Sequence, residues 1–155
     1  MKTFFFNSQR ARPDLGHVET QRLGKAQFPS LVEESHIELW RLGDPFPPHG
    51  EHVIWLGVAV WSLYDMELLD VFEAKLSQET LRERIFVFDM DSFVGLDFEN
   101  YLPGIGKIFH PPIVGSWSQG VLEEKLSGAG AREWLIRRFK LKGYRGTYDW
   151  MKETP

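Results

Sequence analysis

Apolar positions divide the middle of the chain into segments with two different periods. Val53–Val60 is an almost unbroken apolar run, and Ile85–Met90 is a second one. Such runs are typical of strands that are buried on both faces of a parallel sheet. Between them, Glu67–Leu76 has its leucines and Phe72 at helical spacing, which indicates a helix with one apolar side. The pattern therefore predicts a strand, a helix and a second strand in succession.

The flanking segments extend this α/β pattern. Residues 28–43 predict a short strand and then a helix that carries Ile37, Trp40 and Leu42 on one side and ends at Gly43. Residues 112–128 predict two strands with a turn at 118–120, and residues 130–139 predict a closing helix. We expect an α/β fold whose central mixed sheet has a parallel core and a C-terminal β-hairpin, with helices flanking both faces.

This pattern places one domain at residues 28–142. Residues 1–27 are polar and form an N-terminal extension, and residues 143–155 form a C-terminal tail. No apolar run is long enough for a signal peptide or a membrane span. We therefore expect a cytoplasmic protein that does not contact a membrane.

Composition narrows the chemistry that the chain can perform. None of its 155 residues is a cysteine, which excludes disulfides, thiolate catalysis and cysteine-ligated metal centres. The net charge of −4 gives no overall basic footprint for nucleic acid. No Gly-rich phosphate-binding loop is present either. We expect no cofactor.

The stretch Trp61-Ser62-Leu63-Tyr64-Asp65 joins the first buried strand to the helix after it. Ser62 and Asp65 have the spacing of a capping box, in which the serine oxygen accepts the N–H three residues on. A carboxylate in the first turn also complements the helix dipole. As a nucleophile, Ser62 would need a base, for which His110 is the candidate across the fold. A structural helix cap is the preferred interpretation.

The order of these features resembles the thioredoxin family over about residues 28–140. A buried strand ends at Trp61, where the family has its Trp-Cys-Gly-Pro-Cys motif, and a second strand ends at Asp91. Pro112 precedes the next strand at the place of the family's cis-proline, and Gly128 leads into the last helix. The resemblance implies a thioredoxin-like fold with a cis bond at Pro112.

The functional residues of that family are absent here. Ser62 and Asp65 stand where the two cysteines would be, so thiol–disulfide exchange is excluded. Leu56 and Val87 stand in place of the family's buried acid and its lysine partner. Because no thiol is present to exchange a proton with it, a buried ionisable pair at these positions would only add a desolvation cost. We therefore expect no catalytic residue and no enzyme activity.

What remains of the family's substrate site suggests a surface for another protein. We expect a non-catalytic binding or assembly module of the chaperone or scaffold kind; the alternative is an enzyme that uses the same cleft for non-redox chemistry on a small molecule. Trp61 and Tyr64 should be exposed there, whereas the face of Trp117 is left open. Pro111 has no N–H, which removes one of two main-chain bonds to an extended peptide. The predicted partner-binding residues are Trp61, Ser62, Leu63, Tyr64, Asp65, Pro111, Pro112 and Gly128.

Three other motifs admit a functional and a structural interpretation. His49 and His52 could hold a metal, but prolines and glycine make the segment a loop. Asp89 and Asp91 could bind a metal, but a polar strand end explains them equally. The basic run 137–145 could contact nucleic acid, but cations also complement a helix C-terminus. We favour the structural interpretation of each and predict no metal site.

Overall fold

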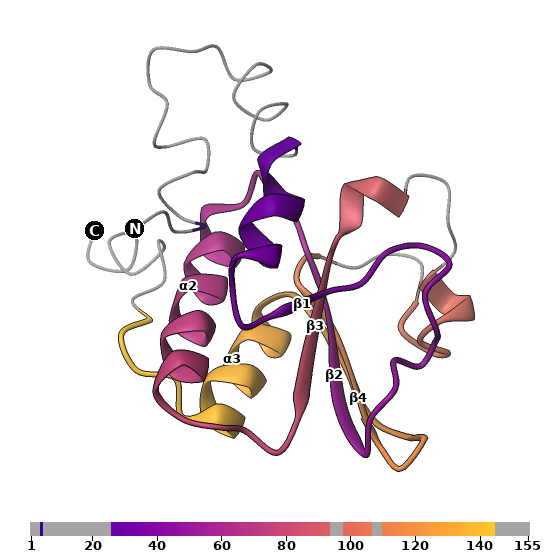
Figure 1. Cartoon of the computed structure of the whole chain (residues 1–155). Coiled ribbons are helices and arrows are strands. Elements are labelled where there is room, and N and C mark those ends of the chain that lie inside the picture. The colour runs from indigo at the N-terminus through magenta and orange to yellow at the C-terminus, as the bar shows by residue number, and fades with distance from the viewer. Residues whose placement is uncertain (1–3, 5–25, 94–97, 107–109, 145–155) are drawn as a thin grey trace, which may run out of the picture.

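A five-stranded mixed sheet forms the centre of the computed structural model, which describes residues 4, 26–93, 98–106 and 110–144 (Figure 1). The strand order is β1-β3-β2-β4-β5. Strands β1, β3 and β2 are parallel to one another. Strand β4 is antiparallel to both of its neighbours, β2 and β5. The strands are β1 Glu38–Leu39, β2 His52–Val58, β3 Arg84–Asp89, β4 Ile113–Ser118 and β5 Val121–Ser127. This arrangement confirms the predicted α/β class with its parallel core and C-terminal hairpin.

The α-helices pack on one face of this sheet (Figure 1). Helix α2, Leu63–Gln78, follows β2 and is longer at both ends than predicted, and α3, Gly128–Phe139, follows β5. Residues 26–33 are also helical. Their apolar sides enclose a core of aliphatic residues and phenylalanines, in which Leu56 and Val87 are fully buried partners on β2 and β3. No helix among the described residues is long and apolar enough to cross a membrane.

The opposite face of the sheet is covered in a different way. Its core is an aromatic cluster in which Trp55 stacks on Phe88 with ring centroids 4.2 Å apart. The cover comes from the Pro-rich loop through Phe46 and from two 3-10 helices, η2 Met90–Phe93 and η3 Phe98–Asn100. Helical elements therefore flank both faces, but the described ones on this face are short 3-10 turns.

The order of elements predicted for residues 28–43 was wrong. The helix comes first, at 26–33, and β1 follows it. Ile37 and Trp40 lie in the cores on opposite faces of the sheet, as residues three apart do on an extended chain. Leu42 is 60% exposed and belongs to neither core. The three apolar residues therefore mark an edge strand and its exit rather than one side of a helix.

The predicted N-terminal extension is tied to the domain at one described point. Phe4 is buried, its ring lies 6.0 Å from that of Phe28, and its N–H donates to Asp70 Oδ1. The helix at 26–33 crosses the predicted boundary at residue 28. The other residues of the extension, and all of the tail beyond Tyr144, lie outside the described residues.

Candidate functional site

The junction between β2 and α2 is a capped helix start. Ser62 has an extended backbone, with φ −86° and ψ 117°, and its side chain accepts a hydrogen bond from Asp65 N at 3.4 Å. Ser62 N donates to Ala59 O at 2.9 Å, which closes the turn after β2. Ser62 is therefore the N-cap that the sequence pattern predicts.

Asp65 does not make the reciprocal bond of the capping box that its spacing predicts. Its side chain is fully buried, and Oδ2 accepts the backbone N–H of Ala59 at 2.9 Å. In a capping box the acidic side chain would bond back to the N-cap N–H, but here Ser62 N is bonded to Ala59 O. The carboxylate instead holds the last turn of chain before the helix. Oδ1 makes no hydrogen bond.

The environment of Asp65 shifts its protonation toward neutrality. Burial raises the pKa of the Asp65 carboxyl to about 7, because a charge is poorly solvated there. The Ala59 N–H and the positive charge of Arg132 act in the opposite direction and limit the rise. A carboxyl with this pKa changes its charge near neutral pH.

Arg132 of α3 connects Asp65 with the rest of the junction. Its Nη1 lies 3.9 Å from Asp65 Oδ1 and donates to Pro111 O at 3.4 Å. The guanidinium carbon lies 5.3 Å from the centre of the Tyr64 ring, in cation–π geometry. The Arg132 side chain is 16% exposed, so this cation is partly withdrawn from water. One side chain thus contacts α2 and the loop before β4.

The proline pair and Gly128 form the other side of the site. The Pro111–Pro112 peptide bond is cis. Gly128 N donates to Pro112 O at 2.8 Å and so joins the start of α3 to this loop. Gly128 has φ +65°, and a Cβ there would lie 3.5 Å from His110 Cβ. A residue with a side chain would be strained in this left-handed conformation.

Strand order and connectivity now identify the architecture. A helix follows the central strand β2, the proline pair immediately precedes β4, and Gly128 opens the last helix after the hairpin. These are the features that the sequence resemblance implied. The fold is thioredoxin-like.

Comparisons with known proteins add similarity at the level of structure only. The sequence matches no protein-family model, and it matches no curated protein. Among solved structures the chain is similar to chloroplastic thioredoxin z, with 17% identity and a TM-score of 0.42 over 67% of this chain and 94% of that one. It is also similar to part of ERdj5, with 14% identity and a TM-score of 0.47 over 84% of this chain and 18% of that one.

The two aromatic residues of this thioredoxin-like junction differ in exposure. Trp61 is 44% exposed, as expected, but Tyr64 is half-buried because its ring lies under Arg132. Leu63 is also half-buried. Trp117, whose face was left open, is buried in the aromatic cluster. Trp61 is thus the exposed aromatic side chain at this junction.

The histidine and aspartate motifs have structural surroundings. His52 Nδ1 lies 3.1 Å from Ser118 Oγ, and His49 O accepts a hydrogen bond from Arg84. Asp89 accepts hydrogen bonds from Asp91 N and from the Ser92 hydroxyl at the start of η2. Within the described residues, no group of three acidic, histidine or cysteine side chains could hold a metal.

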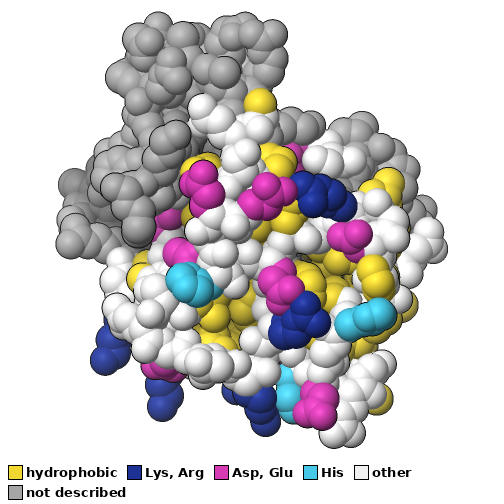
Figure 2. Space-filling model, viewed as in Figure 1, with side chains coloured by type: hydrophobic (Ala, Val, Ile, Leu, Met, Phe, Trp, Pro, Cys, Tyr) yellow, Lys and Arg dark blue, Asp and Glu magenta, His cyan; other side chains and the backbone are white. Residues whose placement is uncertain are grey.

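Two arginines in the described part of the basic run have acidic partners. Arg138 pairs with Glu83 at 2.7 Å, and Arg137 lies 3.4 Å from Glu133. The face shown in Figure 2 likewise carries acidic and basic side chains side by side. These pairings lessen the local positive charge on which nucleic-acid binding depends.

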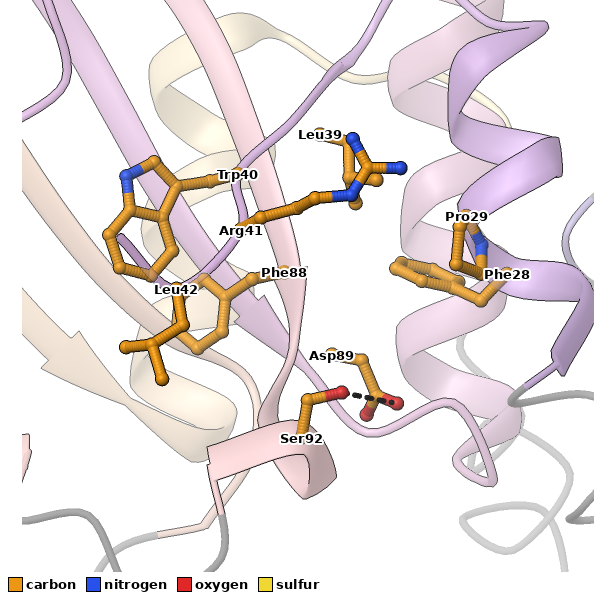
Figure 3. A pocket seen from close by; sticks show the side chains of 9 residues that line it. All are labelled: Phe28, Pro29, Leu39, Trp40, Arg41, Leu42, Phe88, Asp89 and Ser92. Carbon is orange, nitrogen blue, oxygen red and sulfur yellow. Dashed lines mark hydrogen bonds between the residues drawn. The ribbon is translucent and has the colours of Figure 1, made fainter. Parts of the chain in front are cut away.

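A pocket of about 200 Å³ lies beside the edge strand β1 and shares no lining residue with the junction (Figure 3). It is at the carboxyl end of β3, where open α/β sheets commonly bind ligands. Phe28 and Phe88 contribute apolar walls, Asp89 is bonded to Ser92, and Arg41 is paired with Glu33 at 2.8 Å. None of the predicted site residues lines it. The pocket offers an apolar volume whose polar groups already interact with neighbouring side chains.

Sequence reasoning missed Arg132 and the burial of Asp65. The sequence does contain a signal for the burial of Asp65. Asp65 precedes Leu69 by four residues and Phe72 by seven, which places it on the same side of α2 as these two apolar residues. That spacing puts the carboxyl on the apolar stripe. Arg132 follows Ala131, which belongs to the buried stripe of α3, and its contact with α2 depends on how the two helices pack. The spacing of residues within one helix gives no information about how two helices pack.

Proposed function

We propose that this thioredoxin-like domain is a non-catalytic protein-binding or assembly module that engages its partner through Trp61, without thiol–disulfide exchange. The observation that carries the proposal is the 44% exposure of Trp61 next to the buried Ser62 cap. Exposed aromatic residues on a rigid support are common anchors of protein interfaces, and tryptophan is enriched among those that dominate binding. The cap and the buried carboxyl beneath it provide such a support.

The main chain beside Trp61 is poorly suited to grip an extended peptide. Pro111 has no N–H to donate, and its carbonyl already faces the guanidinium of Arg132 at 3.4 Å. Both atoms that could pair with an added strand are therefore unavailable or engaged. Burial of the Trp61 side chain, rather than strand addition, should supply most of the affinity.

The chain supplies two matched controls for this proposal. Leu42 and Val121 are also large exposed hydrophobic residues, at 60% and 65%. Leu42 follows β1 and lines the pocket beside it, and Val121 begins β5 after the hairpin turn. Partners captured on the wild-type chain from its native host are identified by mass spectrometry, purified and titrated by calorimetry. We expect Trp61→Ala to weaken binding by about 30-fold or more, whereas Leu42→Ala and Val121→Ala leave it within about twofold. Equal losses for all three variants would contradict a Trp61 anchor.

A second candidate function is an enzyme that uses the former active-site region for non-redox chemistry on a small molecule. It is supported by the pKa of about 7 at Asp65, since general acids and bases act best when their pKa lies near the working pH. The full burial of Asp65 opposes it, because a catalytic group must reach its substrate. Native mass spectrometry of the purified chain would reveal a retained small molecule. Its loss in Asp65→Asn, with the fold intact, would favour this candidate.

A further inference from the structure

The contacts of Arg132 leave one of its neighbours incompletely satisfied. Asp65 Oδ2 is bonded to Ala59 N, but the buried Oδ1 has no hydrogen-bond partner although Arg132 Nη1 is only 3.9 Å away. This separation is about 1 Å longer than a charge-assisted hydrogen bond. The arrangement fits a neutral carboxyl, because an ionised one would gain strongly from closing that gap.

The same guanidinium has two weaker interactions that compete for its position. It donates to Pro111 O at 3.4 Å, which is a long hydrogen bond, and it lies over the Tyr64 ring at 5.3 Å. Neither neighbour carries a formal charge in neutral solution. A full negative charge on Asp65 would therefore outweigh both of them in this partly buried setting.

We propose that Asp65 and Arg132 form a proton-controlled clamp between α2 and α3. When Asp65 Oδ1 carries a proton, Arg132 is held by the Pro111 carbonyl and the Tyr64 ring. When that proton passes to solvent, Arg132 Nη1 moves toward Oδ1 and forms a hydrogen-bonded ion pair. The guanidinium then shifts relative to Tyr64 and Pro111, so the surface beside Trp61 has two arrangements.

The groups that face Asp65 permit this assignment. Helix α3 contributes Arg132, whose charge acts directly on the carboxyl, and the chain before α2 contributes only the backbone N–H of Ala59. Tyr64 lies on the same helix as Asp65, and the exposed His110 lies beside Gly128 at the start of α3. His110 is an ionisable side chain close to this end of α3, so a His110 variant serves as the control. The clamp is a property of the free chain and does not depend on the proposed partner.

Side-chain NMR of the full chain between pH 5 and 9 tests the clamp. We expect the Asp65 carboxyl carbon and the Arg132 Nε–H resonance to shift together with one midpoint near pH 7, and the Arg132 step to vanish in Asp65→Asn. In Arg132→Met the Asp65 midpoint should rise by about one pH unit or more, because an opposite charge has been removed. In His110→Gln both steps should remain. Titration of Asp65 near pH 4, an Arg132 resonance that ignores Asp65, or loss of the steps in His110→Gln would each overturn the proposal.

Discussion

Two buried regions on the helical face of the sheet treat ionisable groups in opposite ways. At the centre, Leu56 and Val87 face each other in register on β2 and β3, and both are fully buried and apolar. At the start of α2, Asp65 is equally buried but keeps its carboxyl. The thioredoxin resemblance places a charged pair at the first region and a cysteine at the position of Asp65.

The difference between the regions lies in what the surroundings can offer to a charge. Backbone N–H and C=O groups of the central strands are used in the ladders between β3, β2 and β4, so a carboxylate at position 56 would find no donor. Just beyond the end of β2, the backbone N–H of Ala59 donates to Asp65. Helix α3 places a guanidinium nitrogen of Arg132 3.9 Å from the Asp65 carboxyl. A buried acid is tolerable where such partners exist and costly where they do not.

The largest effect should follow from placing a carboxylate in the apolar region. We expect Leu56→Asp to lower the free energy of unfolding by more than about 4 kcal/mol, since it buries a charge without a partner. Urea unfolding at pH 7 measures this. The neutral isostere Leu56→Asn is the matched control and should lose less, because it has nearly the shape of aspartate without the charge. Equal free energies of unfolding for the two variants would contradict the claim that the region around Leu56 cannot accommodate a charge.

Removal of the cation from the other region should have a smaller effect that depends on pH. We expect Arg132→Met to cost about 1–3 kcal/mol at pH 8, because Asp65 is ionised in the wild type at this pH and the variant lacks the cation that stabilises that charge. At pH 5 the loss should be clearly smaller, because Asp65 is then protonated. Arg137→Met is the control: Arg137 is exposed and pairs with Glu133 one turn away, so its loss should be below about 0.5 kcal/mol at both values. A pH-independent loss for Arg132→Met would break the link to Asp65.

The smallest effect concerns the cap that precedes the buried acid. Ser62→Ala should destabilise the chain by about 1 kcal/mol, because the Asp65 N–H loses its acceptor at the helix start. Ser77 lies in the last turn of the same helix and is exposed, so Ser77→Ala should change stability by less than about 0.5 kcal/mol. Thermal unfolding of both variants gives the comparison. If Ser62→Ala were neutral, Ser62 would not act as a cap.

The apolar region could be predicted from sequence, because its residues follow simple periodicities. The runs at 53–60 and 85–90 are long, and strands buried on both faces have few alternatives. The error at 28–43 arose where the apolar residues were sparse: Ile37, Trp40 and Leu42 fit one side of a helix, but each has a different environment in the fold. Edge segments carry a weaker pattern because only part of their surface is buried.

The site was predicted less well because it is made by contacts between elements. Ser62 as a cap follows from local spacing and is confirmed. The half-burial of Tyr64 and the burial of Asp65 both depend on α3, which begins more than sixty residues later along the chain. A contact between side chains so far apart in the sequence cannot be predicted from the local pattern of apolar residues. The capping-box prediction considered α2 alone and therefore said nothing about the contacts that Asp65 makes with α3.

The most direct test of the contrast is the free energy of unfolding as a function of pH for the wild type and for Asp65→Asn. The pKa of Asp65 is about 7 in the folded chain and about 3.9 in an unfolded one. Between these values unfolding releases a proton, so the Asp65 contribution to stability is full below about pH 4, falls by about 1.4 kcal/mol per pH unit, and levels off above pH 7. We expect this slope in the difference between wild type and Asp65→Asn from urea titrations. Parallel pH profiles for the two proteins, or a wild type that gains stability relative to the variant as the pH rises from 4 to 7, would contradict the account.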